Sequence, residues 1–285
     1  MRVDSIKTVG VLGAGTMGNG IAHVFARSGY EVILCDVEQR FLDRALETID
    51  NNLNREVKKG KISEADKSAA VARIHPEVGV EALSAADFAV EAVPERLDLK
   101  IRVLKDADAV LRPGVILASN TSSISITELA ARTNRPERFI GMHFMNPVPV
   151  MVLVEVIRGL ATGDDTVQTT VSLCERLDKR PVVVNDAPGF VSNRVLLPMI
   201  NEAAFAVMEG VATPEAVDAI MKTGMNHPMG PLELADLIGL DVCVDILGVL
   251  FQGFGDPKYR ACPLLRNYVA AGWLGRKSGR GFYRY

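Results

Sequence analysis

Three glycines near the start of the chain have the spacing of a turn that binds phosphates. In the stretch "VGVLGAGTMGNGIAHVFARSGYEVILCD" they are Gly13, Gly15 and Gly18, and Asp36 closes the stretch. The first glycine permits a tight turn, the second lets the backbone approach a pyrophosphate, and the third lets a helix pack closely on a strand. A carboxylate at Asp36 can accept hydrogen bonds from both ribose hydroxyls of a dinucleotide and would repel a 2′-phosphate. The stretch therefore predicts a dinucleotide site that prefers NAD to NADP.

The cofactor-binding residues expected from this turn are Gly13, Gly15, Thr16, Met17, Gly18 and Asp36. Two other interpretations stay open, a glycine-rich turn in another α/β protein and an FAD site. Arg40 complicates the choice of cofactor, because an arginine close to Asp36 could hold a 2′-phosphate, although on a helix it could equally face solvent.

A histidine and a glutamate form the second candidate for chemistry. His143 stands near the carboxyl end of the apolar run "FIGMHF", and this is the end of a strand at which α/β sheets place their sites. Imidazole titrates near neutral pH, so His143 can serve as the base that removes the proton of an alcohol. Glu155 lies within the apolar run "VLVEVI", where a carboxylate is costly unless it is paired. The alternatives are a core histidine bonded to a backbone carbonyl and a surface glutamate on an edge strand.

The first half of the chain supplies elements that can position these residues. Short apolar runs alternate with helical patterns, which implies an α/β fold of the Rossmann type, a parallel sheet with helices on both faces. Strands are predicted at residues 7–12, 31–35, 88–93, 115–118, 139–144, 151–157 and 181–184, with a helix at 17–27. We expect no helix before either of the last two strands, so the edge of the sheet should be mixed.

A long helical pattern over residues 40–61 predicts a projecting helical arm. Its apolar residues recur at every fourth position and form one stripe: Phe41, Ala45, Ile49, Leu53 and Val57. The pattern ends in "KKGK", where Gly60 is a suitable helix stop. The helix is longer than a dinucleotide fold needs to cross between two strands, so part of it should project.

The character of the chain changes after residue 186. Little strand pattern remains, and helices are expected at residues 190–208, 232–238, 241–251 and 264–271, with a further start at Thr213 and Pro214. Residues 1–186 are therefore predicted to form the NAD-binding domain, and residues 187–285 a second, all-α domain. The helix at 190–208 is apolar around much of its circumference, which predicts burial in a core or between subunits.

Composition narrows the class of protein. The chain has 285 residues and a net charge of −3, which argues against nucleic acid as a partner. The four cysteines are scattered and suit reduced thiols better than disulfides or a metal site. We find no signal-peptide core and no apolar run of membrane-spanning length, so we expect a cytoplasmic protein with no membrane partner.

Several longer motifs carry a resemblance to one family. They are "EAVPE" (91–95), "SNTSS" (119–123), "GMHFMNPVPVM" (141–151), "PGFVSNRV" (188–195), "HPMGPLELADLIGLD" (227–241) and the terminal "GRKSGRGFYRY" (275–285). Together they closely resemble the 3-hydroxyacyl-CoA dehydrogenases, and among them the stand-alone bacterial 3-hydroxybutyryl-CoA dehydrogenases. The resemblance covers essentially the whole chain, and the runs around His143 and Asn193 are far more specific than the glycine motif.

The resemblance implies NAD-linked interconversion of an (S)-3-hydroxyacyl-CoA, with short-chain 3-hydroxybutyryl-CoA expected, and the 3-ketoacyl-CoA. It also implies a Rossmann-type domain with a helical hairpin, and an all-α domain that builds a homodimer. By the same resemblance His143 is the general base and Glu155 orients it. Ser122 matches a serine that bonds the C3 oxygen of the substrate, and Asn193 matches an asparagine that faces the thioester. Alternatives are a helix cap for Ser122 and a structural amide for Asn193.

Other residues match the cofactor side and the CoA side of the family. Glu95, Lys100, Ser122 and Asn146 match residues that line the nicotinamide, and Lys277 matches a lysine that reaches the cofactor. Glu95 and Lys100 could instead form a surface pair, and a lysine in the tail is usually solvated.

For the CoA phosphates the match gives Asn52 and Lys59, with Lys58 and Lys61 in support. A solvated run of charge is the alternative. Val152 departs from the family, which often has lysine there. The rival functions are another β-hydroxyacid dehydrogenase, of the lambda-crystallin or gulonate type, and an NAD-sensing protein without activity.

Overall fold

The chain divides after Asp186 in the computed structural model, which describes residues 3–285. The first unit contains the eight strands of the sheet, and the second, Ala187–Tyr285, contains α7 to α11. Among residues 3–285 no helix is both long and apolar enough to cross a membrane.

The sheet of the first unit has the strand order β3-β2-β1-β4-β5-β6-β7-β8. Neighbouring strands from β3 to β6 pair in parallel, β6 and β7 are antiparallel, and β7 and β8 are parallel again. The strands are β1 (Thr8–Leu12), β2 (Glu31–Asp36), β3 (Ile74–Val78), β4 (Phe88–Glu91), β5 (Ile116–Ser119), β6 (Phe139–Phe144), β7 (Leu153–Arg158) and β8 (Arg180–Asn185). The predicted Rossmann-type fold with a mixed edge is confirmed.

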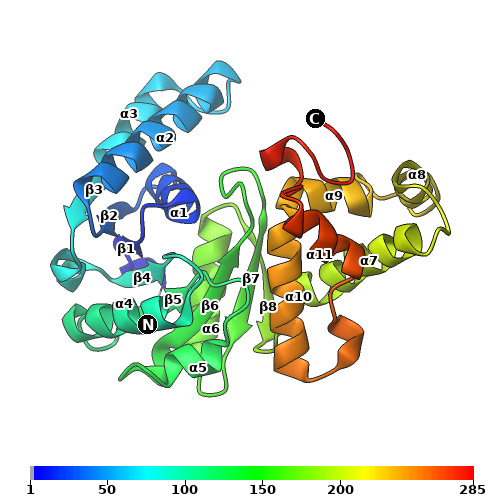
Figure 1. The fold of residues 1–285 in the computed structure, drawn as a ribbon. Coiled ribbons are helices and arrows are strands. Elements are labelled where there is room, and N and C mark those ends of the chain that lie inside the picture. Colours follow the sequence, from blue (N-terminus) through cyan, green and yellow to red (C-terminus); the bar gives the residue numbers. More distant parts are fainter. Residues whose placement is uncertain (1–2) are drawn as a thin grey trace. The chain divides into compact units, whose positions relative to one another are not determined.

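Helices cover both faces of this sheet (Figure 1). They are α1 (Thr16–Arg27), α2 (Gln39–Lys58), α3 (Glu64–Ala72), α4 (Leu97–Val110), α5 (Ile126–Ala130) and α6 (Asp164–Arg176). Side chains of α1, α2 and α6 share one hydrophobic core with the strands, and α4 lies on the opposite side of the sheet from α1. The expectation that no helix precedes the last strand is wrong, because α6 connects β7 to β8.

The predicted arm is a hairpin of two helices, α2 and α3 (Figure 1). The apolar stripe of α2 faces inward, with Ala45, Ile49 and Leu53 at most 1% exposed. The helix ends at Lys58, earlier than predicted, and Gly60 takes a φ of +66° in the turn that follows. The hydroxyl of Ser63 accepts a hydrogen bond from the Asp66 amide and starts α3, so the chain reverses at the C-terminal end of the predicted long helix.

The second unit is built from helices, as predicted. They are α7 (Ser192–Met208), α8 (Pro214–Gly224), α9 (Pro231–Ile238), α10 (Leu240–Phe254) and α11 (Pro263–Ala270). Thr213 caps α8 by accepting a hydrogen bond from the Ala216 amide, and Pro214 occupies the first position of the helix. Leu197 and Ile200 of α7 join a core with Leu247 of α10.

Candidate active site

The glycine turn between β1 and α1 has the shape of a nucleotide cradle. Gly13 takes a φ of +98°, and a Cβ there would lie 2.8 Å from the Ala92 carbonyl oxygen. A Cβ on Gly18 would lie 1.7 Å from the carbonyl oxygen of Gly13, so α1 approaches the strand only because Gly18 has no side chain. A Cβ on Gly15 would meet nothing within 4 Å, which leaves open space at the start of α1. No side chain caps this helix start, and Thr16 and Met17 form its first turn. The turn therefore fits a pyrophosphate in front of Gly15.

Asp36 stands at the end of β2, beside this turn. One carboxylate oxygen accepts a hydrogen bond of 2.6 Å from the Ala14 amide, and the other accepts one of 2.7 Å from the Val37 amide. Each carboxylate oxygen has a further lone pair for a ribose hydroxyl. Arg40 lies 2.7 Å from the carboxylate of Glu38 and is 72% exposed, so it pairs on the surface. The turn thus fits a dinucleotide without a 2′-phosphate.

His143 and Glu155 face each other across the antiparallel strands β6 and β7. Nδ1 of the imidazole lies 2.8 Å from a carboxylate oxygen of Glu155, and the two residues are 8% and 3% exposed. Since an ionised carboxylate can only accept, the proton belongs on Nδ1, and Nε2 is the nitrogen that carries the lone pair. The pair is thus arranged as a base with an orienting acid.

Ser122 lies in a turn between β5 and α5, not at the start of a helix. The helix begins at Ile126, and its cap is Ser125, whose hydroxyl accepts from the Glu128 amide. The turn is held instead by Glu95, whose Oε1 accepts from the amides of Ser122 and Ser123 at 2.9 and 3.0 Å. Burial would raise the pKa of Glu95, but Lys100 and the hydrogen bonds from the turn outweigh it and lower the pKa below its ordinary value.

Lys100, on α4, is only 1% exposed. Its ammonium lies 2.7 Å from Glu91 and 3.3 Å from Glu95, so Glu95 and Lys100 do form a pair, but with the lysine buried. The sequence motifs predict no role for Glu91. Its signal is a carboxylate within the apolar run "FAVEAV", where burial demands a partner.

Two further residues hold the backbone around His143, and neither was predicted. Asn120 accepts a hydrogen bond of 2.9 Å from the Phe144 amide, which ties the Ser122 turn to the strand of His143. Lys179 donates at 2.5 and 2.8 Å to the carbonyls of Val148 and Met151, in the loop after β6 that carries the exposed Asn146.

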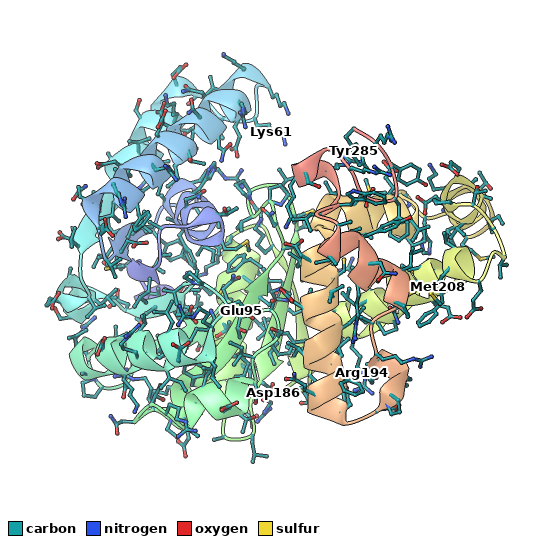
Figure 2. The ribbon with its side chains drawn as sticks, in the orientation of Figure 1. Lys61, Glu95, Asp186, Arg194, Met208 and Tyr285 are labelled. Atoms are coloured by element: carbon teal, nitrogen blue, oxygen red, sulfur yellow. The ribbon has the colours of Figure 1, made fainter. Side chains whose placement is uncertain are left out.

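The arm and the second unit carry the other predicted residues. Asn52 of α2 accepts a hydrogen bond of 3.2 Å from Arg55. Lys58 ends the helix, Lys59 and Lys61 follow it, and all three lysines are exposed. Figure 2 shows Lys61 at the tip of the arm. In the second unit Asn193 lies in the first turn of α7, after Gly189 and Phe190 with positive φ. Lys277 lies 2.6 Å from the Asp241 carboxylate and lowers its pKa against the effect of burial.

A Rossmann-type sheet, a glycine cradle that fits a dinucleotide and a buried imidazole–carboxylate pair define a nucleotide-dependent oxidoreductase. Residues 8–187 match the sequence model of the 3-hydroxyacyl-CoA dehydrogenase NAD binding domain, and residues 189–285 match that of the C-terminal domain of the same family. The chain therefore belongs to the 3-hydroxyacyl-CoA dehydrogenase family. It is an NAD-dependent enzyme.

Relatives of similar length agree with this assignment. A probable 3-hydroxybutyryl-CoA dehydrogenase of Bacillus subtilis is 56% identical over 98% of both chains. A 3-hydroxybutyryl-CoA dehydrogenase of Bradyrhizobium diazoefficiens is 54% identical over 98% of this chain and 96% of that protein. Among solved structures, an (S)-3-hydroxybutyryl-CoA dehydrogenase of Ralstonia eutropha has a TM-score of 0.96 at 53% identity, with 99% of each chain covered.

Proposed function

We propose that this enzyme interconverts (S)-3-hydroxybutyryl-CoA and acetoacetyl-CoA, as a short-chain member of its family. The relatives named above share more than half of its residues and carry this substrate in their names. The observation that carries the proposal is the 2.8 Å contact of His143 with Glu155, because the reaction needs a base whose tautomer is fixed.

His143 removes the hydroxyl proton of the substrate through Nε2. The imidazolium that forms is stabilised by Glu155, which accepts the Nδ1 proton in a hydrogen bond. NAD, when bound, accepts the hydride from C3. Ser122 bonds the C3 oxygen, and Asn193 donates its amide to the acyl thioester, where charge develops. In the reverse direction the protonated His143 returns the proton to the ketone oxygen.

The glycine turn would hold the cofactor, with Asp36 accepting hydrogen bonds from its ribose. Gly13, Gly15, Thr16, Met17 and Gly18 would bind its pyrophosphate. Its nicotinamide side would be lined by Glu95, Ser122 and Asn146, with Lys100 behind Glu95. Lys277 of the second unit is the further residue that would contact the cofactor.

The phosphates of CoA bind to the arm. Asn52 and Lys59 contact them, and Lys58 and Lys61 add positive charge at an exposed turn. The second domain, residues 187–285, holds the acyl portion and forms a homodimer. Exposed apolar side chains on its helices, such as Val195 at 66% and Phe251 at 43%, support such an interface. The enzyme works in the cytoplasm.

A spectrophotometric assay of NADH oxidation tests this function. We expect turnover with acetoacetyl-CoA and NADH, slower turnover with NADPH, and no formation of NADH from NAD and free 3-hydroxy acids. Activity on free acids alone would favour a gulonate-type dehydrogenase, and binding of NADH without any turnover would favour a sensor.

A further inference from the structure

A buried ion pair lies behind the turn that carries Ser122. The side chain of Glu91, at the end of β4, is 0% exposed, and that of Lys100 is 1% exposed. Removing two charges from water is expensive, and a buried pair contributes little net stability compared with apolar packing. A pair of this kind beside a cofactor site therefore calls for an explanation other than stability.

The Lys100 ammonium contacts three oxygen atoms of the protein. It contacts Glu91 at 2.7 Å, the Val93 carbonyl at 3.0 Å and Glu95 at 3.3 Å. An ammonium has three donors, so these three partners account for its full capacity. Glu91 is fixed in turn, because it accepts hydrogen bonds of 2.6 Å from the Ser119 hydroxyl and 2.7 Å from the Val93 amide.

Glu95 joins this buried pair to the turn. One of its oxygens faces Lys100, and the other accepts from the Thr121 hydroxyl at 2.7 Å and from the amides of Ser122 and Ser123. Its side chain is 37% exposed, so it is the outward end of the chain of contacts (Figure 2). A shift of the Lys100 ammonium would therefore move Glu95, and with it the backbone of Ser122.

We propose that Glu91 is a positioning residue for the nicotinamide side of the site: it fixes Lys100, Lys100 fixes Glu95, and Glu95 holds the turn of Ser122. Lys100 thus acts on the cofactor side through Glu95. The turnover assays that test this proposal rest on the proposed function. The measurement of NADH affinity does not, because it is made without the acyl-CoA.

The test compares Glu91→Gln with Asp108→Asn. Both carboxylates form buried pairs with a cation in the first unit, and Asp108 lies on the same helix as Lys100, where it contacts Arg135 at 2.5 Å. None of the contacts described above joins Asp108 to the Ser122 turn. The Asp108→Asn variant therefore shows only the effect of weakening a buried ion pair on stability. In Glu91→Gln the side chain loses its negative charge, so a neutral amide oxygen replaces the carboxylate beside the ammonium and Lys100 is drawn towards Glu95.

For Glu91→Gln we expect kcat to fall about tenfold, since a misplacement of about 1 Å can cost ~100-fold. The dissociation constant for NADH should rise severalfold, and KM for acetoacetyl-CoA should stay unchanged. In Asp108→Asn all three constants should match the wild type. Combined with Ser122→Ala, Glu91→Gln should lower kcat by less than the product of the two single effects, because both act on one turn. If Glu91→Gln folds poorly, the double variant with Lys100→Met removes both buried charges. It should show the same decrease in kcat and the same loss of NADH affinity.

The proposal is overturned if Glu91→Gln matches Asp108→Asn in kcat and in NADH affinity, or if its effect multiplies fully with that of Ser122→Ala. If the wild type fails to reduce acetoacetyl-CoA, the proposed function falls instead, and NADH affinity in the two variants still decides the role of Glu91.

Discussion

The proposed role of the His143 imidazole as a base depends on the register of two strands. An antiparallel pairing places Glu155 directly opposite it, so a carboxylate that would be costly inside an apolar strand is paired at 2.8 Å. The same contact fixes the tautomer, since Nδ1 must carry the proton. Both residues could be chosen from the sequence, because a polar side chain in an apolar run is conspicuous, but their distance depends on a pairing that the pattern only suggests.

Replacing His143 by alanine tests the base directly. We expect kcat to fall by several powers of ten, while the dissociation constant for NADH stays nearly unchanged, because the base is lost and the glycine cradle is untouched. His75→Ala is the matched control, since His75 pairs with Glu31 on the surface and is 52% exposed. A His143 variant that keeps a tenth of the wild-type turnover would exclude the role.

At the scale of elements, the helices and strands that could be predicted from the sequence are those whose apolar side chains recur with one regular spacing. The strand of His143 has the predicted bounds, 139–144, because all six of its residues are buried. Helix α6 was missed because its buried face carries Thr166, Thr169 and Thr170, which hide the apolar period and have low helix propensity. Strand β3 was missed because its sequence, "IHPEV", has a proline and charge, which the edge of a sheet tolerates.

The Ser122 turn shows why part of the site was beyond sequence reasoning. Its conformation depends on Glu95, 27 residues earlier in the chain, and on the buried pair behind it. Nothing in the local sequence distinguishes Ser122 from Ser125, which is the actual helix cap. Only the family resemblance selected Ser122, and not Ser125, as the candidate.

The arm is joined to α1 by a charged cluster that predicts a pH dependence. Glu56 of α2 lies 3.1 Å from Arg27, and 3.2 Å from His23 without the alignment of a hydrogen bond. Burial would raise the pKa of Glu56, but its contacts with His23 and Arg27 outweigh this and lower the pKa to about 2. A lowered pKa means stabilisation that is fully present above the ordinary value of 4.5 and is lost as pH falls toward about 2.

Glu56→Gln should therefore lower the free energy of unfolding by up to about 3 kcal/mol near neutral pH. The gap between variant and wild type should close progressively below pH 4.5, as Glu56 of the wild type becomes protonated. Denaturant titrations over a series of pH values measure this gap. Glu47→Gln, an exposed change on the same helix, should show no gap at any pH. A gap that persists unchanged to pH 2.5 would contradict the assignment.

The tip of the arm carries the prediction for CoA. Charge reversal by Lys59→Glu should raise KM for acetoacetyl-CoA several-fold and leave KM for NADH unchanged, since an exposed lysine beside phosphates contributes mainly attraction. Lys105→Glu makes the same charge change on the exposed face of α4 and should alter neither constant. Raising the salt concentration should shrink the difference between wild type and Lys59→Glu. Equal KM values for acetoacetyl-CoA in all three proteins would remove the arm from the proposed site.

At the scale of the whole molecule, the proposed chemistry draws on both units. The first unit supplies the cofactor cradle and the base, whereas Asn193 and Lys277 belong to the second. The change from strands to helices after residue 186 could be seen in the sequence. The sequence does not predict how the second unit would associate with another copy, because a helix that is apolar all round can be buried in a core or against a subunit.

Helix α7 has apolar side chains that are buried in a core and others that are exposed. Leu197 and Ile200 are fully buried in the core of the second unit, while Val191, just before the helix, and Val195, one turn later, are 51% and 66% exposed. Exposed apolar patches are a feature of protein interaction surfaces. We therefore assign this face of α7 to the proposed homodimer.

Val195→Asp should weaken that dimer, because it places a charge in an interface that excludes water. The expected result is a monomer by light scattering at a concentration where the wild type has the mass of two chains, with an unchanged far-UV circular dichroism spectrum. Leu160→Asp is the control, since Leu160 is 90% exposed in the first unit and lies outside the proposed interface. It should keep the mass of the wild type. If the wild type is itself monomeric at all concentrations, or if Val195→Asp remains dimeric, the exposed face of α7 is not the dimer contact.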